Sequence, residues 1–304
     1  MLEICLLGTG GTMPMPGRAL TALMARYGGS NLLIDCGEGT QVQIRKKKWS
    51  IQSIDHVLIT HLHGDHIIGL PGLLLSMGKD GRKSPLEIYG PAGTGQMVAG
   101  LLLAAPELPF EVRVTELKEE EESFLCGGLR IQAFAADHSV KCYGYAIHAD
   151  RARKFDPEKA RAFGIPQSLW SRLQKGETVT SYTPDMVLGE SREGLLVTYI
   201  TDSRPTPLIQ KYAKNADLFV CEGMYGSQDK LDKALLNQHM LFTEAAQLAK
   251  AANARRLWLT HYSPSLENPR EFLPAVQAIF PEAAVPDDLT SITLHWKEKK
   301  EEGL

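Results

Sequence analysis

Three histidines and an aspartate stand close together in this 304-residue chain, within the stretch Thr60-His61-Leu62-His63-Gly64-Asp65-His66. His61 and His63 are two residues apart, so in extended backbone both imidazoles leave on the same side and can share one ion. Asp65 and His66 follow a glycine turn and can face a neighbouring ion. Imidazole and carboxylate ligands suit zinc, with manganese and iron as competitors. The stretch therefore predicts half of a two-metal site, and its alternative is a polar helix N-terminus without an ion.

Candidate ligands also follow apolar runs elsewhere in the chain. In open α/β sheets, sites assemble at the carboxyl ends of strands, so a strand that ends beside a ligand delivers it to the sheet rim. Alone, each later candidate is more often an ordinary buried or surface residue, but together they complete the ligand count of a two-metal site. Four β-rich runs each precede a candidate ligand: residues 56–60 precede His61, 129–136 precede His138, 195–200 precede Asp202 and 257–260 precede His261.

These residues resemble the pattern of a known superfamily. The His-x-His-x-Asp-His loop and the three later candidate ligands are similar to the metallo-β-lactamase superfamily of binuclear hydrolases. Within it, residues 7–12 (LGTGGT), 34–41 (IDCGEGTQ) and 59–74 (ITHLHGDHIIGLPGLL) resemble the short form of the ribonuclease Z family. Members of that family are endonucleases that trim tRNA precursors at their 3′ end. The similarity runs along nearly the whole chain and is densest before residue 95.

The resemblance implies two divalent metal ions per subunit. Zinc is the first expectation for both ions, and manganese or iron are the alternatives. The ligand sets that the resemblance implies are His61, His63 and His138 for one ion, Asp65, His66 and His261 for the other, and Asp202 as a bridge.

The same resemblance implies how the reaction runs. Two ions ~3.5–4 Å apart lower the pKa of the water between them towards ~7, so that a metal hydroxide attacks phosphorus. Asp65 takes the proton of the attacking water, and His239 protonates the departing 3′ oxygen. Glu222 is a candidate for orienting His239. The chain departs from the family near these residues, because Thr201-Asp202-Ser203, Cys221-Glu222-Gly223-Met224 and His239-Met240-Leu241 stand in place of Gly-Asp-Thr, His-Glu-Ala-Thr and His-Ser-Thr.

The rest of the chain alternates strands and helices. Strand-rich segments followed by βα units in both halves predict two mixed sheets stacked face to face with helices outside, the αββα sandwich of the superfamily. We expect one α/β domain over residues 1–304. Strands are predicted near residues 2–8, 22–27, 31–35, 56–60, 86–90, 111–115, 129–136, 143–148, 195–200, 217–221, 256–260 and 291–296, and helices near 38–47, 66–77, 93–104, 205–214, 243–252 and 269–279.

Composition sets broad limits on the function. A hydrophobic content of 43% with a net charge of −3 is ordinary for a globular protein. No apolar run approaches the ~20 residues that a membrane span needs, and the first residues lack the basic region of a signal peptide, so we expect a cytoplasmic protein without a membrane partner. Five scattered cysteines without a Cys-x-x-Cys disfavour disulfides and thiolate zinc sites. The acidic run 119–122 is expected to be solvated surface.

One long excursion interrupts the strand pattern. About fifty residues separate the strand-like runs near 143–147 and 195–199, far beyond the usual connection of ~4–6 residues. Two short helices are predicted there, at 157–163 and 167–173, and the excursion resembles the tRNA-gripping arm of the family with its Gly-Pro-rich tip shortened or absent. We expect a substrate-binding arm over residues 150–190, whose alternative is a bland insertion covering the sheet edge. From Asp150 to Lys175 it carries three acidic residues against seven basic candidates for RNA contact: Arg151, Arg153, Lys154, Lys159, Arg161, Arg172 and Lys175.

Three functions stay open on the sequence. The first is an endonuclease that cuts precursor tRNA on the 3′ side of the discriminator nucleotide, leaving a 3′ hydroxyl, and that forms a homodimer as the family does. The second is a small-molecule phosphodiesterase, favoured by the shortened arm. The third, a redox or binding protein, is disfavoured, because the diiron oxidoreductases of the superfamily usually have glutamate in place of the second loop histidine, here His63, and append a flavin domain.

Overall fold

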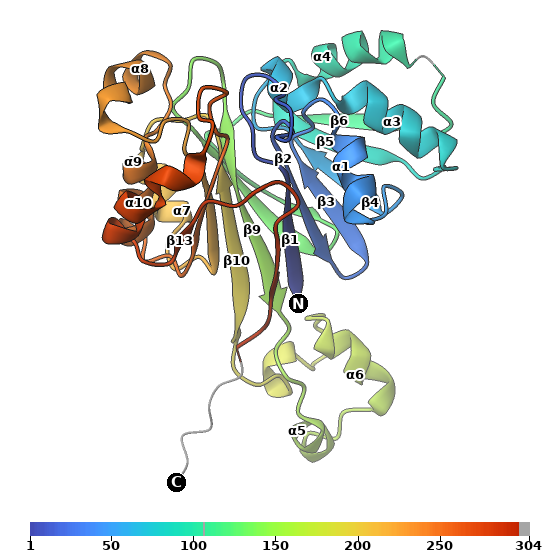
Figure 1. Ribbon diagram of the computed structural model, residues 1–304. Helices are drawn as coiled ribbons and strands as arrows, with labels where there is room; N and C mark the ends of the chain where they lie inside the picture. Colours follow the sequence, from blue (N-terminus) through green and yellow to red (C-terminus); the bar gives the residue numbers. More distant parts are fainter. Residues whose placement is uncertain (106, 298–304) are drawn as a thin grey trace. The chain divides into compact units, whose positions relative to one another are not determined.

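The computed structural model describes residues 1–105 and 107–297, which divide into two compact units. The first unit comprises residues 1–149 and 196–295, and the second comprises residues 150–195 with 296–297. Within the first unit two mixed sheets face each other, and helices cover their outer sides (Figure 1). This arrangement is the αββα sandwich that the sequence predicted.

The first sheet has the order β14-β1-β2-β3-β4-β5-β6 among the described residues. The strands from β14 to β3 pair antiparallel and those from β3 to β6 pair in parallel. In β1 the residues from Ile4 to Gly8 are buried without alternation, as expected for a strand covered on both faces. The strand bounds are β1 Leu2–Gly8, β2 Ala22–Tyr27, β3 Ser30–Ile34, β4 Ile54–Leu58, β5 Leu86–Pro91, β6 Val112–Leu117 and β14 Ser291–Leu294.

The second sheet has the order β13-β12-β11-β10-β9-β8-β7 among the described residues. The strands β10 to β13 pair in parallel, whereas β7, β8 and β9 pair antiparallel. The carboxyl ends of β10, β11 and β12 therefore meet at one rim. The strand bounds are β7 Glu121–Cys126, β8 Leu129–Ala135, β9 Tyr143–Arg151, β10 Arg192–Ile200, β11 Leu218–Glu222, β12 Leu257–Thr260 and β13 Ala283–Ala284.

Helices with one apolar face close the two outer sides of the sandwich. Ile44 and Leu73 belong to a buried cluster on the first sheet, and Ala245 and Val276 belong to the corresponding cluster on the second. No helix within the described residues is both long and apolar enough to cross a membrane. The helices of this unit are α1 Thr40–Lys47, α2 Gly64–Ile67, α3 Leu70–Lys79, α4 Thr94–Leu101, α7 Pro207–Tyr212, α8 Leu231–Leu236, α9 Phe242–Ala251 and α10 Leu273–Ile279, with 3₁₀ turns at Leu102–Ala104, Gln228–Lys230 and Pro269–Phe272.

The second unit is small and has a core of its own. It contains α5 (Pro157–Ala162), α6 (Gln167–Gln174) and a 3₁₀ turn at Pro184–Met186. Asp156 caps α5 by accepting hydrogen bonds from the backbone N–H groups of the first helical turn, which would otherwise lack partners. The buried cluster of this unit consists of Ala160, Ile165, Leu173, Val187 and Leu188.

The main error of the sequence prediction concerns the acidic run at 119–122. Most of this run is exposed, as expected, but Glu121 and Glu122 begin β7, which pairs with β8 at the sheet edge. Glutamate has a low strand propensity, and an edge strand needs only one apolar face, so the run carried little strand signal.

Two further elements were not predicted, the helix predicted near 66–77 is two helices (α2 and α3), and several boundaries differ from the prediction. β13 has two residues, too few for any periodicity, and α8 was not predicted because its leucines 235 and 236 are exposed and give no apolar stripe. β4 ends at Leu58 rather than at residue 60. His61 is therefore carried by a loop beyond the strand.

Candidate metal centre

Loops beyond the carboxyl ends of four strands assemble the site. β4, β8, β10 and β12 are followed within three residues by His61, His138, Asp202 and His261, respectively. His261 and Asp35 both adopt a positive φ, of 59° and 58°. This backbone conformation is uncommon outside glycine, and it persists where the surrounding structure enforces it.

The glycine-rich loop that follows β1 passes directly beside the candidate ligands. A Cβ on Gly11 would lie 2.6 Å from Cε1 of His261, so no larger residue fits there without a shift. The next residue, Thr12, donates its backbone N–H to Oδ2 of Asp65 at 2.7 Å. The loop thus brings its backbone close to the site and fixes one carboxylate oxygen of Asp65.

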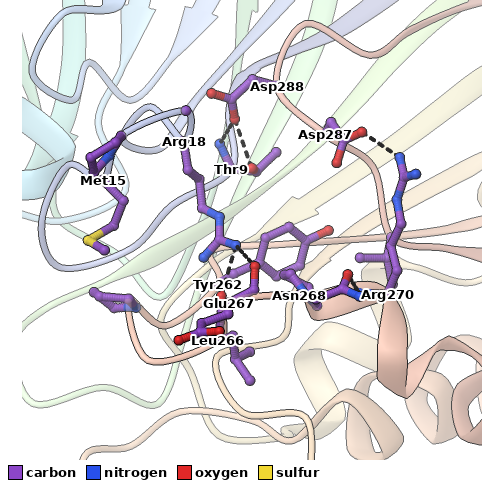
Figure 2. Close-up of a pocket in the computed structure, with 15 residues that line it drawn as sticks. Thr9, Met15, Arg18, Tyr262, Leu266, Glu267, Asn268, Arg270, Asp287 and Asp288 are labelled. Atoms are coloured by element: carbon purple, nitrogen blue, oxygen red, sulfur yellow. Dashed lines mark hydrogen bonds and ion pairs between the residues drawn. The ribbon is translucent and has the colours of Figure 1, made fainter.

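Asp288 and Arg18 hold this loop in place (Figure 2). The Asp288 carboxylate accepts hydrogen bonds from the backbone N–H and hydroxyl of Thr9, at 3.0 and 2.8 Å, and from the backbone N–H of Ala19 at 2.6 Å. Arg18 donates to the carbonyl oxygen of Leu266 at 2.9 Å. Thr9, Arg18, Leu266 and Asp288 line a cavity of about 600 Å³ beside the loop. The side chains of Arg18, Arg270 and Asp288 there are already paired with protein groups, which favours a structural role for this cavity.

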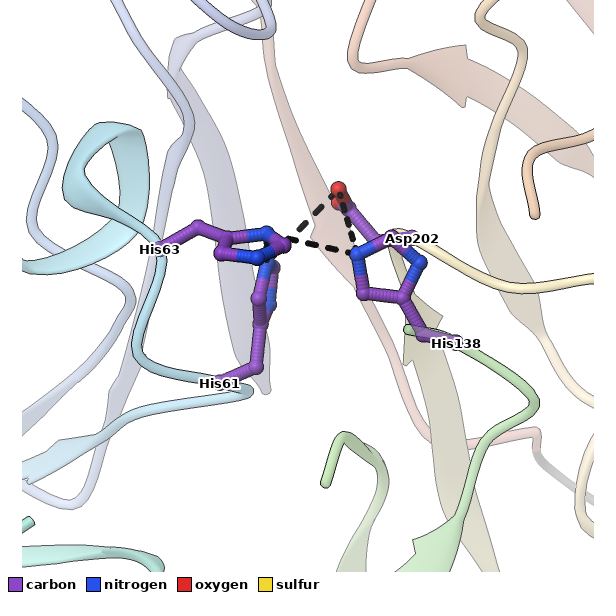
Figure 3. Close-up of side chains that lie close together, drawn as sticks. All are labelled: His61, His63, His138 and Asp202. Carbon is purple, nitrogen blue, oxygen red and sulfur yellow. Dashed lines mark hydrogen bonds and ion pairs between the residues drawn. The ribbon is translucent and has the colours of Figure 1, made fainter. Parts of the chain in front are cut away.

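The first group of candidate ligands consists of His61, His63, His138 and Asp202 (Figure 3). His63 Nδ1 lies 3.0 Å from His61 Nε2 and 3.3 Å from His138 Nε2. Oδ2 of Asp202 lies 3.6 Å from His61 Nε2 and 3.7 Å from His138 Nε2. Three ring nitrogens and one carboxylate oxygen therefore face a common point.

The second group consists of Asp65, His66 and His261. The Nε2 atoms of the two histidines are 3.1 Å apart, and Oδ2 of Asp65 lies 3.4 Å from each. Oδ1 of Asp202 is 3.3 Å from His66 Nε2 and 3.2 Å from His261 Nε2. Asp202 thus directs one carboxylate oxygen to each group.

Both groups have the geometry of metal ligands. Two nitrogens that each lie ~2.0–2.1 Å from a tetrahedral ion are ~3.3 Å apart, close to the separations of the ring nitrogens here. Oδ1 of Asp202 is buried and has no hydrogen-bond partner among the described residues, which is costly for a carboxylate unless a cation compensates it. The donor set therefore fits divalent metal ions.

The pKa shifts of His61, His138 and Asp202 in the first group suit metal binding. Burial lowers the pKa of His61 and of His138, so both rings are neutral and keep a lone pair for an ion. Burial raises the pKa of Asp202, but the neighbouring His261, His66 and His61 lower it far more, so this carboxylate stays ionised.

Asp35 supports the second group and was not identified from the sequence. Its Oδ2 accepts a hydrogen bond from Nδ1 of His66 at 2.8 Å, and its Oδ1 accepts one from the backbone N–H of Thr60 at 2.8 Å. A carboxylate on the far nitrogen fixes the tautomer of a ligating histidine and leaves Nε2 free for the metal. The available signal was an acidic residue directly after the apolar strand β3, within the 34–41 motif.

His239 lies beside the two ligand groups. Its Nε2 is 3.9 Å from Oδ2 of Asp202, and its Nδ1 is 3.2 Å from Oε2 of Glu222. Glu222 is fully buried and is held by the backbone N–H groups of Ser203, at 2.6 Å, and Met240, at 3.1 Å. Burial lowers the pKa of His239, but the Glu222 and Asp202 carboxylates raise it more, to about 9. The ring is therefore protonated at neutral pH and oriented by Glu222.

A cavity of about 650 Å³ opens onto both ligand groups. Its wall includes Asp65, Asp202, His138 and His239, and α8 contributes Lys233 to its rim. A cavity of this size accommodates a scissile phosphodiester with part of the flanking nucleotides. Four of the seven metal-ligand candidates, namely His63, Asp65, His138 and Asp202, thus line one hollow together with His239. Helix α8 is a part of this hollow that the sequence did not indicate.

The seven basic candidates of residues 150–190 all lie in the second unit. Arg153 donates to the carbonyl oxygens of Gly189 and Leu188 and pairs with Asp185, so its guanidinium serves the fold of the unit. Arg151 donates to the carbonyl oxygen of residue 297 and is half-buried, whereas the others are exposed: Lys154, Lys159, Arg161, Arg172 and Lys175.

Comparison with known proteins identifies the family to which this chain is related. The model of the beta-lactamase superfamily domain matches residues 30–262. The ribonuclease Z of Lachnospira eligens is 52% identical over 303 residues, covering 98% of this chain and 100% of that protein. The ribonuclease Z of Lachnoclostridium phytofermentans is 52% identical over 304 residues, covering 99% and 100%.

A solved structure agrees with these relatives. Human tRNase Z, short form, superposes with a TM-score of 0.69 at 26% identity, covering 96% of this chain and 98% of the human chain. The sheet order, the ligand groups and this full-length similarity lead to one conclusion. The chain belongs to the ribonuclease Z family of the metallo-β-lactamase superfamily.

Proposed function

We propose that this protein is a metal-dependent endoribonuclease that removes the 3′ trailer from tRNA precursors and leaves a 3′ hydroxyl on the tRNA. The observation that carries the proposal is Asp202, which directs one oxygen to each of two ligand groups at a single cavity. Two adjacent cations suit an in-line displacement at phosphorus. The full-length similarity to proteins named ribonuclease Z supports precursor tRNA as the substrate.

We assign two divalent ions to the centre, zinc first, with manganese or iron as alternatives. His61, His63 and His138 would hold one ion, Asp65, His66 and His261 the other, and Asp202 both. When bound, such ions supply a nucleophilic water at neutral pH and neutralise charge that develops on the phosphate oxygens.

Asp65 would orient the attacking water and accept its proton. Burial raises the pKa of Asp65, but hydrogen bonds from His261 and His66 lower it far more, so the carboxylate is ionised at neutral pH. Thr12 occupies Oδ2, which leaves Oδ1 to face the water. A positioned carboxylate of this kind contributes typically ~10²–10⁴-fold to the rate.

His239 would donate a proton to the departing 3′ oxygen. With a pKa of about 9 the ring carries that proton at neutral pH. Glu222 binds Nδ1, so Nε2 is the atom that faces the cavity. The leaving alkoxide is a strong base, so a proton delivered in the transition state lowers the barrier to its departure.

The second unit would bind the body of the tRNA. Its exposed lysines and arginines offer contacts to backbone phosphates, which position an RNA without reading its sequence. A homodimer is expected from the family resemblance and stays a prediction, which light scattering of the purified protein tests.

A cleavage assay tests the proposed function. The protein would be incubated with a 3′-labelled tRNA precursor and with a small generic phosphodiester, before and after Asp65→Ala. We expect cleavage after the discriminator nucleotide, a 3′ hydroxyl on the tRNA, and loss of both activities in the variant. A metal-loaded protein that hydrolyses the diester but leaves the precursor intact would refute the RNA substrate.

A further inference from the structure

One rim of the active-site cavity has no part in the chemistry above. Lys233, Leu236 and Asn237 lie at i, i+3 and i+4 on α8 and its C-cap, so they share a helix face, and all three line the cavity. The side chain of Leu236 is 82% exposed. Figure 1 shows α8 and the ligand-bearing α2 at the same end of the two sheets. This rim, comprising Lys233, Leu236 and Asn237, is called the α8 rim.

The charge of the α8 rim is unusual for this cavity. Of the described residues that line the cavity, Lys233 is the only lysine or arginine, whereas Asp65 and Asp202 contribute carboxylates. Lys233 Nζ lies 5.4 Å from the centroid of the Tyr225 ring, and Tyr225 Oη accepts a hydrogen bond from Asn237 Nδ2 at 2.9 Å. A cation–π contact and a fixed ring therefore keep the ammonium near the cavity mouth.

The α8 rim lies on the leaving-group side of the centre. The centroid of the Tyr225 ring, which Lys233 contacts, is 6.3 Å from the centroid of the His239 ring. His239 donates to the departing 3′ oxygen under the proposed function. Asp65 acts on the water, which must approach phosphorus from the opposite side in an in-line displacement. The nucleotide that carries the 3′ oxygen therefore extends past His239 towards α8.

We infer that Lys233 binds the phosphate on the 5′ side of the discriminator nucleotide, one nucleotide before the scissile bond. The exposed apolar face of Leu236 packs against the ribose or base of that nucleotide. A nucleotide offers an anion and an apolar surface side by side, which matches the two exposed groups of the α8 rim. This subsite deepens the proposed function and rests on it.

A charge-neutral phosphate analogue tests the contact. Precursor tRNA would be synthesised with a methylphosphonate at the phosphate 5′ of the discriminator, and kcat/KM would be measured for the wild type and for Lys233→Ala on both substrates. We expect the analogue to cost the wild type about fivefold, in line with an exposed ion pair. Lys233→Ala should show the same loss on the natural substrate and less than a twofold further loss with the analogue. For Lys233→Ala, the slope of log kcat/KM against log salt concentration should become shallower by the amount expected for the loss of about one phosphate contact.

Two matched variants make the result specific. Lys230 is an exposed lysine three residues away that pairs with Asp229 at 2.7 Å and does not line the cavity. Lys230→Ala should therefore behave as the wild type on both substrates, and Lys233→Arg should recover most of the loss. The subsite would be overturned if the loss from the analogue and the loss from Lys233→Ala multiplied when they were combined. It would also be overturned if Lys233→Ala caused no loss. A wild type that leaves precursor tRNA uncut would instead overturn the proposed function.

Discussion

The metal centre and the second unit use polar side chains in opposite ways. In the centre, His61, His66 and His261 are almost completely buried, and their ring nitrogens face other ligands within 3.0–3.1 Å. In the second unit, Lys154 and Lys175 are exposed, and no carboxylate of a described residue pairs with either ammonium. Buried polar groups that converge are suited to metal binding, whereas exposed charges are suited to contacts with a polyanion, the role that the proposed function gives the second unit.

This difference predicts different consequences of substitution. A change in the centre leaves a buried group uncompensated and should abolish turnover of every substrate. A change in the second unit removes one screened contact among several, so it should affect only a large polyanionic substrate and should depend on salt. The two regions should therefore differ both in the size of the effect and in the substrates that are affected.

The largest effect is expected for Asp202→Ala. Among the described residues, Asp202 is the one that faces both ligand groups. Its loss should therefore lower kcat by ~10⁴-fold or more on precursor tRNA and on a small diester alike. Elemental analysis of the variant should show reduced metal content, and circular dichroism should verify folding. A folded variant that keeps activity within tenfold of the wild type would remove Asp202 from the centre.

His239→Ala should slow the cleavage of a substrate with a basic leaving group more than that of a substrate with an acidic one. We expect a loss of ~10²–10³-fold in kcat on precursor tRNA, because the 3′ oxygen then departs without a proton. A diester with an acidic phenol as its leaving group needs no such proton, so its turnover should fall far less. Steady-state kinetics on the two substrates measures the ratio. Equal losses on both would assign His239 to the metal or to the fold instead.

Glu222→Gln should change the pH profile by shifting its alkaline limb. The Glu222 carboxylate raises the pKa of His239, so the acid form is present below about pH 9 and is lost as the pH rises through that value. Without the charge this pKa falls, and the alkaline limb of kcat should move to lower pH with a loss of about tenfold near pH 8. An unchanged limb would show that Glu222 does not tune His239.

The smallest effect is expected from the second unit. Lys154→Glu combined with Lys175→Glu should raise KM for precursor tRNA about tenfold at low salt and make its salt dependence shallower. Turnover of a small diester should stay within twofold, because a small substrate lacks the run of backbone phosphates that the exposed lysines would contact. An equal drop in the turnover of the diester and of RNA would contradict the expected difference between the two regions.

The sequence predicted the candidate metal ligands and missed residues whose place at the site depends on tertiary packing. His61 to His66 were identified because one short loop holds them, and the later ligands because each follows an apolar strand. Asp35 was missed because its contact with His66 arises only when β3 and β4 pair. Lys233 was missed because its helix is short and shows no apolar stripe, so the helix itself was not predicted. Tertiary pairing supplies this information, and a single sequence does not display it.

The most direct test of the account is a metal titration followed by activity. Protein purified without chelators would be stripped, reloaded stepwise with Zn²⁺, and assayed on precursor tRNA, with bound metal counted by elemental analysis at each step. We predict that turnover rises until two ions per chain are bound and then levels off. Full activity with one ion or none would contradict a centre in which Asp202 serves two ligand groups at once.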